Sequence, residues 1–199
     1  MKITAITPQV KRRDRYSIFV DDAYAFSLSE NGLLESGLHA GQQLDAAELR
    51  ALKKAAGLDK AYQNALRYVA LRPRSQWEMG EYLRRKEVDA AAATHIVQRL
   101  QQLGLLNDAA FARSWVAYRR GLKSISRRRL QLELAQKRIA EDIIAQVLRE
   151  DSTADHAALA NAITKKRRRY PDQQKLIRYL ASQGFLYEDI KSALADDTC

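Results

Sequence analysis

The stretch FARSWVAYRRGLKSISRRRLQLELAQKRI, residues 111–139, carries the pattern that decides the fold of this chain. Phe111, Trp115, Tyr118 and Leu122 recur at i, i+4, i+7 and i+11, the spacing of one face of a helix. The stretch also holds one acid, Glu133, against nine basic residues, which are Arg113, Arg119, Arg120, Lys123, Arg127, Arg128, Arg129, Lys137 and Arg138. It therefore predicts two helices, each with an apolar side to bury and a cationic side to expose.

The composition is that of a globular protein with a strongly basic balance. Of 199 residues, 46% are hydrophobic and 29% are charged, and the formal net charge is +10 with a sequence pI of about 9.8. Residues 111–150 hold ten basic and four acidic side chains, so +6 of the +10 lies in one fifth of the chain. Such a protein attracts polyanions, which are nucleic acid, an anionic membrane surface or an acidic protein patch.

Cysteine content and hydropathy indicate the cellular compartment in which this protein is expected. Cys199 is the only cysteine, which excludes an intrachain disulfide and a thiolate metal cluster. The amino-terminal residues MKITAITPQVKRR lack the apolar run of a signal peptide, and no run of about 18 apolar residues could span a bilayer. We therefore expect a cytoplasmic protein without a membrane segment.

The amino-terminal part, residues 1–58, predicts a small β unit followed by short helices. KITAIT (2–7), RYSIFV (15–20) and AYAFSLS (23–29) are rich in β-branched and aromatic residues, and Asp21-Asp22 marks a turn. We place Tyr24, Phe26 and Leu28 on one face of the third strand. The link between the first two strands holds Pro8 and Lys11-Arg12-Arg13, which we interpret as a solvated loop. Asp45 predicts the start of a helix at AAELRALKKAA.

The rest of the chain repeats itself. EYLRRKEV (81–88), LELAQKRI (132–139) and RYLASQGF (178–185) align, so that Leu83, Leu134 and Leu180 correspond. Each aligned segment follows one helical run and precedes another, which predicts tandem three-helix repeats over 59–108, 109–152 and 153–199. The fold class is therefore mainly α, with an elongated, curved array of repeats after a small β-containing unit.

Capping signals agree with this division. Arg72-Pro73-Arg74 should stop one helix, and Ser75-Gln-Trp-Glu78 reads as a capping box for the next. Pro171-Asp172 repeats that signal in the third unit, and Asn107 or Asp108 can cap the helix that contains Phe111. Gly104 and Gly184 stand where helices should end in a left-handed residue.

Catalytic and metal-binding patterns are weak. His39, His95 and His156 are scattered, and the chain has no Gly-rich phosphate loop and no GxSxG or HExxH motif. We expect no enzyme and no metal.

Two basic runs, Arg127-Arg128-Arg129 and Lys165 to Arg169, remain. Consecutive helical residues point about 100° apart, so some of these side chains must be solvated and not face one ligand. Taken together, the runs predict a phosphate-binding surface along the repeats. Trp77, Trp115 and Tyr118 could stack on bases, but we interpret Trp115 and Tyr118 as core residues because they share the apolar stripe of Phe111.

Three phrases in these repeats resemble the RecX family of bacterial recombination regulators. They are RPRSxxE at 72–78, LGLLNDxxFARSWV at 103–116 and SRRRLxxEL at 126–134, and the resemblance runs continuously over about 60–150. It implies binding of the RecA filament in its helical groove, and inhibition of RecA ATPase, strand exchange and coprotease functions by limiting or destabilising filaments. It also implies affinity for single- and double-stranded DNA and no cofactor. We expect a monomer with no membrane partner.

The resemblance transfers no catalytic residues. The glycine that the family places before the hydrophobic anchor is Glu87 in the first repeat and Arg138 in the second, and only Gly184 keeps it, so the first two turns should be left-handed at a cost or capped otherwise. The basic face expected to bind RecA or DNA comprises Arg72, Arg74, Arg84, Arg85, Arg113, Arg119, Arg120, Lys123, Arg127, Arg128, Arg129, Lys137, Lys165, Lys166, Arg167 and Arg168.

Two other functions stay open from the sequence. Small trihelical units also suit an autonomous nucleic-acid-binding protein of helix-turn-helix type, which would select a DNA motif from random duplexes. An enzyme is the third, least favoured reading.

Overall fold

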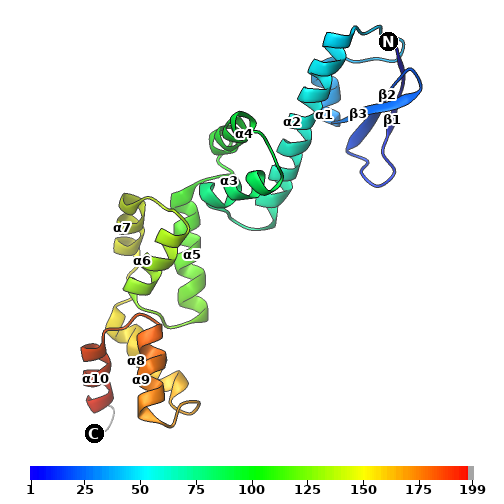
Figure 1. Cartoon of the computed structure of the whole chain (residues 1–199). Helices are drawn as coiled ribbons and strands as arrows, with labels where there is room; N and C mark the ends of the chain where they lie inside the picture. The colour runs from blue at the N-terminus through cyan, green and yellow to red at the C-terminus, as the bar shows by residue number, and fades with distance from the viewer. Residues whose placement is uncertain (197–199) are drawn as a thin grey trace. The chain divides into compact units, whose positions relative to one another are not determined.

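The computed structural model describes residues 1–196, so Cys199 lies outside the described residues. Within them the chain forms ten helices and a three-stranded sheet, which confirms the predicted mainly helical fold of tandem three-helix repeats (Figure 1). The chain divides into two compact units. One joins residues 1–72 to 79–105, and the other joins residues 73–78 to the chain from Leu106 onward.

The amino-terminal sheet has the predicted strands and turn. β1 (Ile3–Pro8), β2 (Arg15–Val20) and β3 (Ala23–Ser29) pair antiparallel in the order β1-β2-β3. The β2–β3 turn has φ of 47° at Asp21 and 65° at Asp22, the left-handed pair that a two-residue hairpin of type I′ requires.

The prediction that Tyr24 shares the buried face of Phe26 and Leu28 is wrong. Ile18 pairs with Phe26, but Phe19 pairs with Tyr24, so Ala25 is an extra residue in β3. Such a bulge shifts the alternation of side chains by one residue. As a result Tyr24 is 59% exposed, while Phe26 and Leu28 stay buried.

The first compact unit packs the sheet against a long helix. After α1 (Glu30–Ser36), α2 runs from Ala46 to Leu71, and Asp45 and Glu48 form a capping box at its start. Asp59 of α2 accepts hydrogen bonds from the Arg15 guanidinium at 3.1 Å and from the Ser29 backbone N–H at 2.8 Å, which ties α2 to two strands. The predicted boundary at 58/59 falls inside α2, and the unit boundaries remain a prediction.

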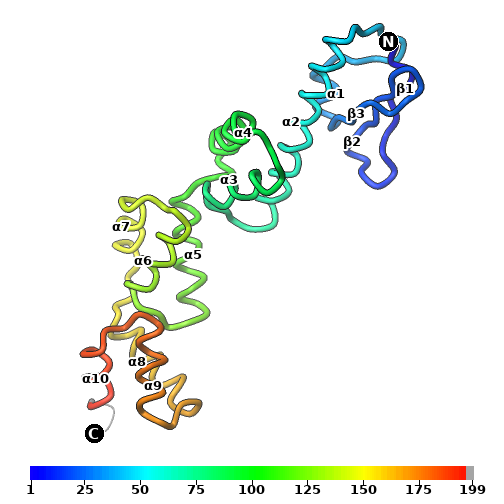
Figure 2. The backbone as a smooth tube through the Cα atoms, in the orientation of Figure 1, coloured from blue at the N-terminus to red at the C-terminus, as the bar shows by residue number. Residues whose placement is uncertain are grey.

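Each repeat contains three helices, which Figure 2 traces as one continuous path. Leu83, Leu134 and Leu180 are all buried, at 1%, 0% and 0% exposure, as the alignment predicts for equivalent anchors. Helices α5–α7 and α8–α10 enclose two separate apolar cores. After α2, the helices are α3 (Gln76–Arg85), α4 (Ala90–Gln102), α5 (Asp108–Leu122), α6 (Arg127–Gln136), α7 (Glu141–Glu150), α8 (Asp155–Lys166), α9 (Gln173–Ser182) and α10 (Tyr187–Asp196).

The helix ends follow the sequence signals. α2 ends at Leu71 before Pro73, Asn107 caps α5, and Asp172 caps α9. Gly104 and Gly184 are left-handed, with φ of 70° and 91°. Glu87 and Arg138 also adopt the left-handed region, with φ of 57° and 56°, so the first two repeats accept the predicted strain. No helix of residues 1–196 is both long and apolar enough to cross a bilayer.

Candidate nucleic-acid and protein interface

Five of the nine basic residues in 111–138 pair with carboxylates of the same repeat or, for Lys137, with Glu78 in the first turn of α3. One enclosed group of these contacts centres on Glu133 of α6, which is 8% exposed. Arg119 of α5 donates from Nε at 2.7 Å, Arg129 from Nε at 3.3 Å, and the Trp115 indole N–H at 3.1 Å. Burial, the largest influence, raises the pKa of Glu133, but the hydrogen bonds from Arg119, Trp115 and Arg129 and the Arg119 charge together hold that pKa below the ordinary value. Glu133, the single acid of the stretch, thus joins α5 to α6.

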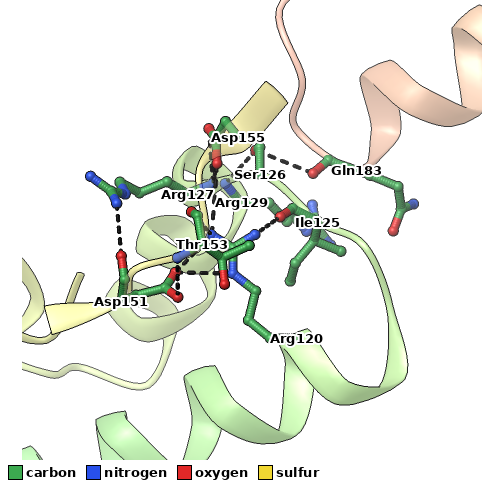
Figure 3. A network of polar contacts seen from close by, with 9 residues as sticks. All are labelled: Arg120, Ile125, Ser126, Arg127, Arg129, Asp151, Thr153, Asp155 and Gln183. Carbon is green, nitrogen blue, oxygen red and sulfur yellow. Dashed lines mark hydrogen bonds and ion pairs between the residues drawn. The ribbon is translucent and has the colours of Figure 1, made fainter. Parts of the chain in front are cut away.

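Arg120 forms a second enclosed contact at the end of α5 (Figure 3). Its guanidinium binds Asp151 at 2.7 Å, and it also donates to the backbone carbonyl of Ile125. The side chains of Arg120 and Asp151 are only 11% and 8% exposed. Burial, the largest influence, raises the pKa of Asp151, but the hydrogen bonds from Arg120 and Thr153 and the Arg120 charge together leave that pKa lowered. Arg120 therefore fixes the loop before α6 and the segment after α7.

Two further basic residues form ion pairs that differ in exposure: the partner of Lys137 is buried, and the pair of Arg113 is exposed. The Lys137 ammonium lies 2.6 Å from Glu78 and 5.2 Å from the centre of the Trp115 ring. Arg113 binds Glu150 of α7 at 2.7 Å, and both side chains are nearly half exposed. An exposed pair of that kind contributes little to stability, so Arg113 could exchange Glu150 for another anion at small cost.

The remaining basic residues of the stretch have no carboxylate partner among residues 1–196. Lys123, Arg128 and Arg138 are exposed, and no hydrogen bond or ion pair of their side chains is found there. The Arg127 guanidinium donates only to the backbone carbonyl of Asp151, at 3.1 Å. We call Lys123, Arg127, Arg128 and Arg138 the open basic residues. Arg138 is an addition to the basic face expected from the sequence, which counts it among the nine basic residues of the stretch but not among the contact residues.

The prediction that Tyr118 and Leu122 are core residues is wrong, since they are 61% and 60% exposed. The buried face of α5 is instead Phe111, Ala112 and Val116. At about 100° per residue, the centre of that face lies roughly 80° from the stripe on which Tyr118 falls. Trp115 lies at its edge and is half-buried, as predicted.

Other predicted contact residues are distributed over both compact units. Arg84 binds Glu81 in an exposed pair, Arg85 donates to the Glu81 carbonyl, and Arg72 and Arg74 flank Pro73 between α2 and α3. In the third repeat, Lys166 lies over the Tyr179 ring, and exposed Lys165, Arg167 and Arg168 surround the end of α8. Whether any of these residues binds RecA or DNA stays a prediction.

Among the hollows of the described residues, one lies within the second repeat and brings an arginine that the sequence did not indicate. Arg127 and Gln131 of α6 and Arg149 of α7 line a cavity of about 240 Å³ floored by Ile144 and Leu148. Arg149 was missed because its run, DIIAQVLRE, reads as an apolar helix with mixed charge. Among residues 1–196, no three His, Cys, Asp or Glu side chains gather as metal ligands, and all three histidines are exposed.

Comparison with protein families matches this chain to three consecutive domain descriptions. Residues 1–45 match the regulatory protein RecX N-terminal domain, residues 61–100 the first RecX three-helix domain, and residues 107–148 the second.

Individual relatives agree along the whole length. A regulatory protein RecX of Listeria monocytogenes serotype 4a is 33% identical over all of this chain and 76% of its own length. One from Halalkalibacterium halodurans is 31% identical over 98% of this chain and 77% of its own length. A crystal structure of regulatory protein RecX aligns with a TM-score of 0.73 at 27% identity, over 96% of this chain and 98% of that one. The crystal structure of RecX from Lactobacillus salivarius, at 24% identity and a TM-score of 0.59 over 70% and 95% of the two chains, shares the fold.

Proposed function

Because this chain belongs to the RecX family of regulatory proteins, we propose that it regulates the RecA recombinase by binding the RecA–DNA filament. The observation that carries the proposal is the family match, which includes the amino-terminal domain and the first two three-helix domains. The protein lies in the helical groove of the filament and limits or destabilises it. ATPase, strand exchange and coprotease functions then fall together. No chemistry of its own is needed, since preferential affinity for one filament state shifts the equilibrium toward that state.

Within this proposal, the open basic residues contact DNA phosphates or acidic protein surface. Four of the nine basic residues of 111–138 are left without a carboxylate, and three of them, Arg127, Arg128 and Arg138, lie on or just after α6. By contrast, Arg119, Arg120 and Lys137 are committed to carboxylates inside the fold. Moving them to a ligand would leave buried acids unpaired, which costs several kcal/mol.

The exposed aromatic and aliphatic residues of α5 add a stacking surface beside Lys123. Tyr118 and Leu122 are one helical turn apart and mostly exposed. An aromatic ring next to cations is the combination that binds single-stranded nucleic acid, because bases stack on the ring while phosphates meet the cations.

The helix-turn-helix alternative is disfavoured in the second and third repeats by the charge of their third helices, whereas α4 of the first repeat has no acid in its first turn. In trihelical DNA-binding domains the third helix enters the major groove with its first residues at the bases. Here α7 begins with Glu141 and Asp142, and α10 has Glu188 and Asp189 in its first turn. Carboxylates at those positions would meet the phosphates that line the groove.

The primary test is RecA-catalysed ATP hydrolysis on single-stranded DNA, with this protein added well below the RecA concentration. We expect ATP hydrolysis to fall as filaments shorten. Unchanged hydrolysis in both low and moderate salt would contradict the proposal.

A matched pair of variants tests the surface. Arg128→Glu with Arg138→Glu reverses two open basic residues, and Glu is tolerated at the second position because Glu87 already occupies its equivalent with φ of 57°. Lys175→Glu with Arg178→Glu is the control, since it makes the same charge change on exposed residues of α9. We expect only the first variant to lose inhibition at least tenfold. If these residues contact DNA phosphates, the plot of the logarithm of the DNA-binding constant against the logarithm of salt concentration should be less steep for the first variant, by roughly 1.5 in slope. If both variants lost the same amount of inhibition, net charge and not the position of the open basic residues would explain the loss.

A further inference from the structure

Two serines at equivalent repeat positions make the same pair of hydrogen bonds. Ser75 precedes α3, and Ser126 precedes α6, each eight residues before the anchor leucine of its repeat. Ser75 Oγ accepts from the Glu78 N–H at 3.1 Å and donates to the Lys137 carbonyl at 3.2 Å. Ser126 Oγ accepts from the Arg129 N–H at 3.1 Å and donates to the Gln183 carbonyl at 3.3 Å.

The acceptor carbonyls also occupy equivalent positions, three residues after Leu134 and after Leu180. Lys137 ends α6 and Gln183 ends α9, where helix carbonyls lack partners inside the helix. The hydroxyl therefore satisfies an N–H of its own helix and a carbonyl of the next repeat at once. Both serines are fully enclosed, at 0% and 1% exposure.

A second contact accompanies each serine. The N–H of the next residue, Gln76 or Arg127, donates at 2.8 Å to an aspartate of the following repeat, Asp108 or Asp155. Each aspartate is the first residue of the first helix of its repeat, α5 or α8. A carboxylate at the start of a helix gains from the unpaired N–H groups there. We call the contacts of Ser75 and Gln76 the first joint. The contacts of Ser126 and Arg127, which Figure 3 shows, are the second joint.

The third repeat breaks the pattern. The equivalent of Ser75 and Ser126 is Asp172, which accepts from the Gln174 and Lys175 N–H groups at 2.8 and 3.2 Å. As a helix cap, aspartate equals serine. An ionised carboxylate has no proton to donate, however, and it would repel both a carbonyl and the aspartate that a following repeat presents.

We infer that the serine before each middle helix fastens the start of that helix to the next repeat, and that Asp172 makes the start of α9 unable to form this joint. The residue at this one position decides whether a repeat accepts a successor, because serine and aspartate differ in donation and charge but not in capping. Asp172 thus also prevents a second copy of the chain from docking a repeat against α9. The inference does not depend on the proposed function.

Hydrogen exchange of three equivalent backbone amides tests it in the unmodified protein. The Gln76 and Arg127 amides should exchange slowly, because each is bound to an aspartate of the next repeat. The Gln173 amide, which has no acceptor among residues 1–196, should exchange at least tenfold faster. Equal protection at Gln173 and Arg127 would overturn the inference.

Substitutions separate the joint from the cap. Ser126→Asp keeps an acceptor for the Arg129 N–H but replaces the hydroxyl donor to Gln183 with a carboxylate that repels that carbonyl, although the Ser126 backbone N–H still donates to it at 3.1 Å. Exchange at Arg127 should therefore rise at least tenfold while Arg129 stays protected. Ser75→Asp should do the same at Gln76, and it serves in place of Ser126→Asp if that variant does not fold. Asp172→Ser is the control and should leave all three amides unchanged. Wild-type protection in Ser126→Asp and Ser75→Asp would show that the serines only cap their helices.

Discussion

The first and second joints share their hydroxyl and aspartate contacts but differ in the groups around them. In the second joint the Ser126 backbone N–H also donates to the Gln183 carbonyl, at 3.1 Å. In the first joint, Lys137 pairs with Glu78 at 2.6 Å, so a charged contact accompanies the serine. In the second, the equivalent of Lys137 is Gln183, and an ion pair between Arg120 and Asp151 holds the segment that leads to Asp155. The two joints therefore share the geometry of their hydroxyl and aspartate hydrogen bonds, although a different ion pair stabilises each of them.

The residue after the helix end shows the second difference. Gly184 occupies that position in the second joint, and a Cβ placed there would lie 2.4 Å from Ser126 Oγ and 2.8 Å from Arg129 Cβ. In the first joint the same position is Arg138, which carries a Cβ. The space beside the residue after the helix end is therefore smaller in the second joint, where Gly184 stands, than in the first, which accommodates the Cβ of Arg138.

Removing the guanidinium that supports the second joint should have the largest effect. Arg120→Met leaves Asp151 enclosed without its cation and the Ile125 carbonyl without its donor. Breaking such a pair costs about 3–5 kcal/mol, because the remaining charge stays buried. Denaturant unfolding should show this loss, and hydrogen exchange should show it at α6 and α8 before the amino-terminal sheet. Arg113→Met, which breaks an exposed pair on the same helix, should cost below about 1 kcal/mol. Similar losses in the two variants would show that enclosure of Arg120 is unimportant.

Closing space in the second joint should have the next largest effect. Gly184→Ala combines a left-handed φ of 91° with a Cβ that meets Ser126 and Arg129, and it should cost about 2–3 kcal/mol. Gly104→Ala is the matched control, because its φ is 70° and a Cβ there meets nothing within 4 Å. The control should cost about 1 kcal/mol by denaturant unfolding. If both variants lose the same free energy, the close approach at Gly184 contributes nothing beyond the backbone conformation.

Local signals in the sequence predicted much of this fold. Apolar periodicity and the alignment of Leu83, Leu134 and Leu180 indicated the three-helix repeats, because burial of an anchor leaves a repeated mark on the chain. Turn and cap chemistry acts over a few residues, so Asp21-Asp22, Asp45 and Asp172 were identified correctly.

Contacts between distant residues left no such mark. A bulge at Ala25 exposed Tyr24, and a rotated α5 exposed Tyr118, since neither strand register nor helix rotation can be read from spacing alone. The same holds for the basic residues. Sequence treats Arg120 and Arg128 alike, and only the packing of α7 and α8 gives Arg120 an enclosed partner. The joints depend on pairs 28 to 62 residues apart, such as Arg127 with Asp155 and Ser75 with Lys137.

The smallest effect should come from giving the first joint the glycine of the second. Arg138 is left-handed with φ of 56°, which costs a residue with a Cβ about 1 kcal/mol more than glycine. Arg138→Gly should therefore stabilise the protein by about 0.5–1 kcal/mol in denaturant unfolding, after allowance for the greater freedom of glycine in the unfolded chain. Arg128→Gly should destabilise by a similar amount, because it removes an equally exposed arginine from regular helix. A loss of stability in Arg138→Gly would mean that its side chain holds the first joint together. In that case the two joints would differ in what this position does, and not only in how closely it packs.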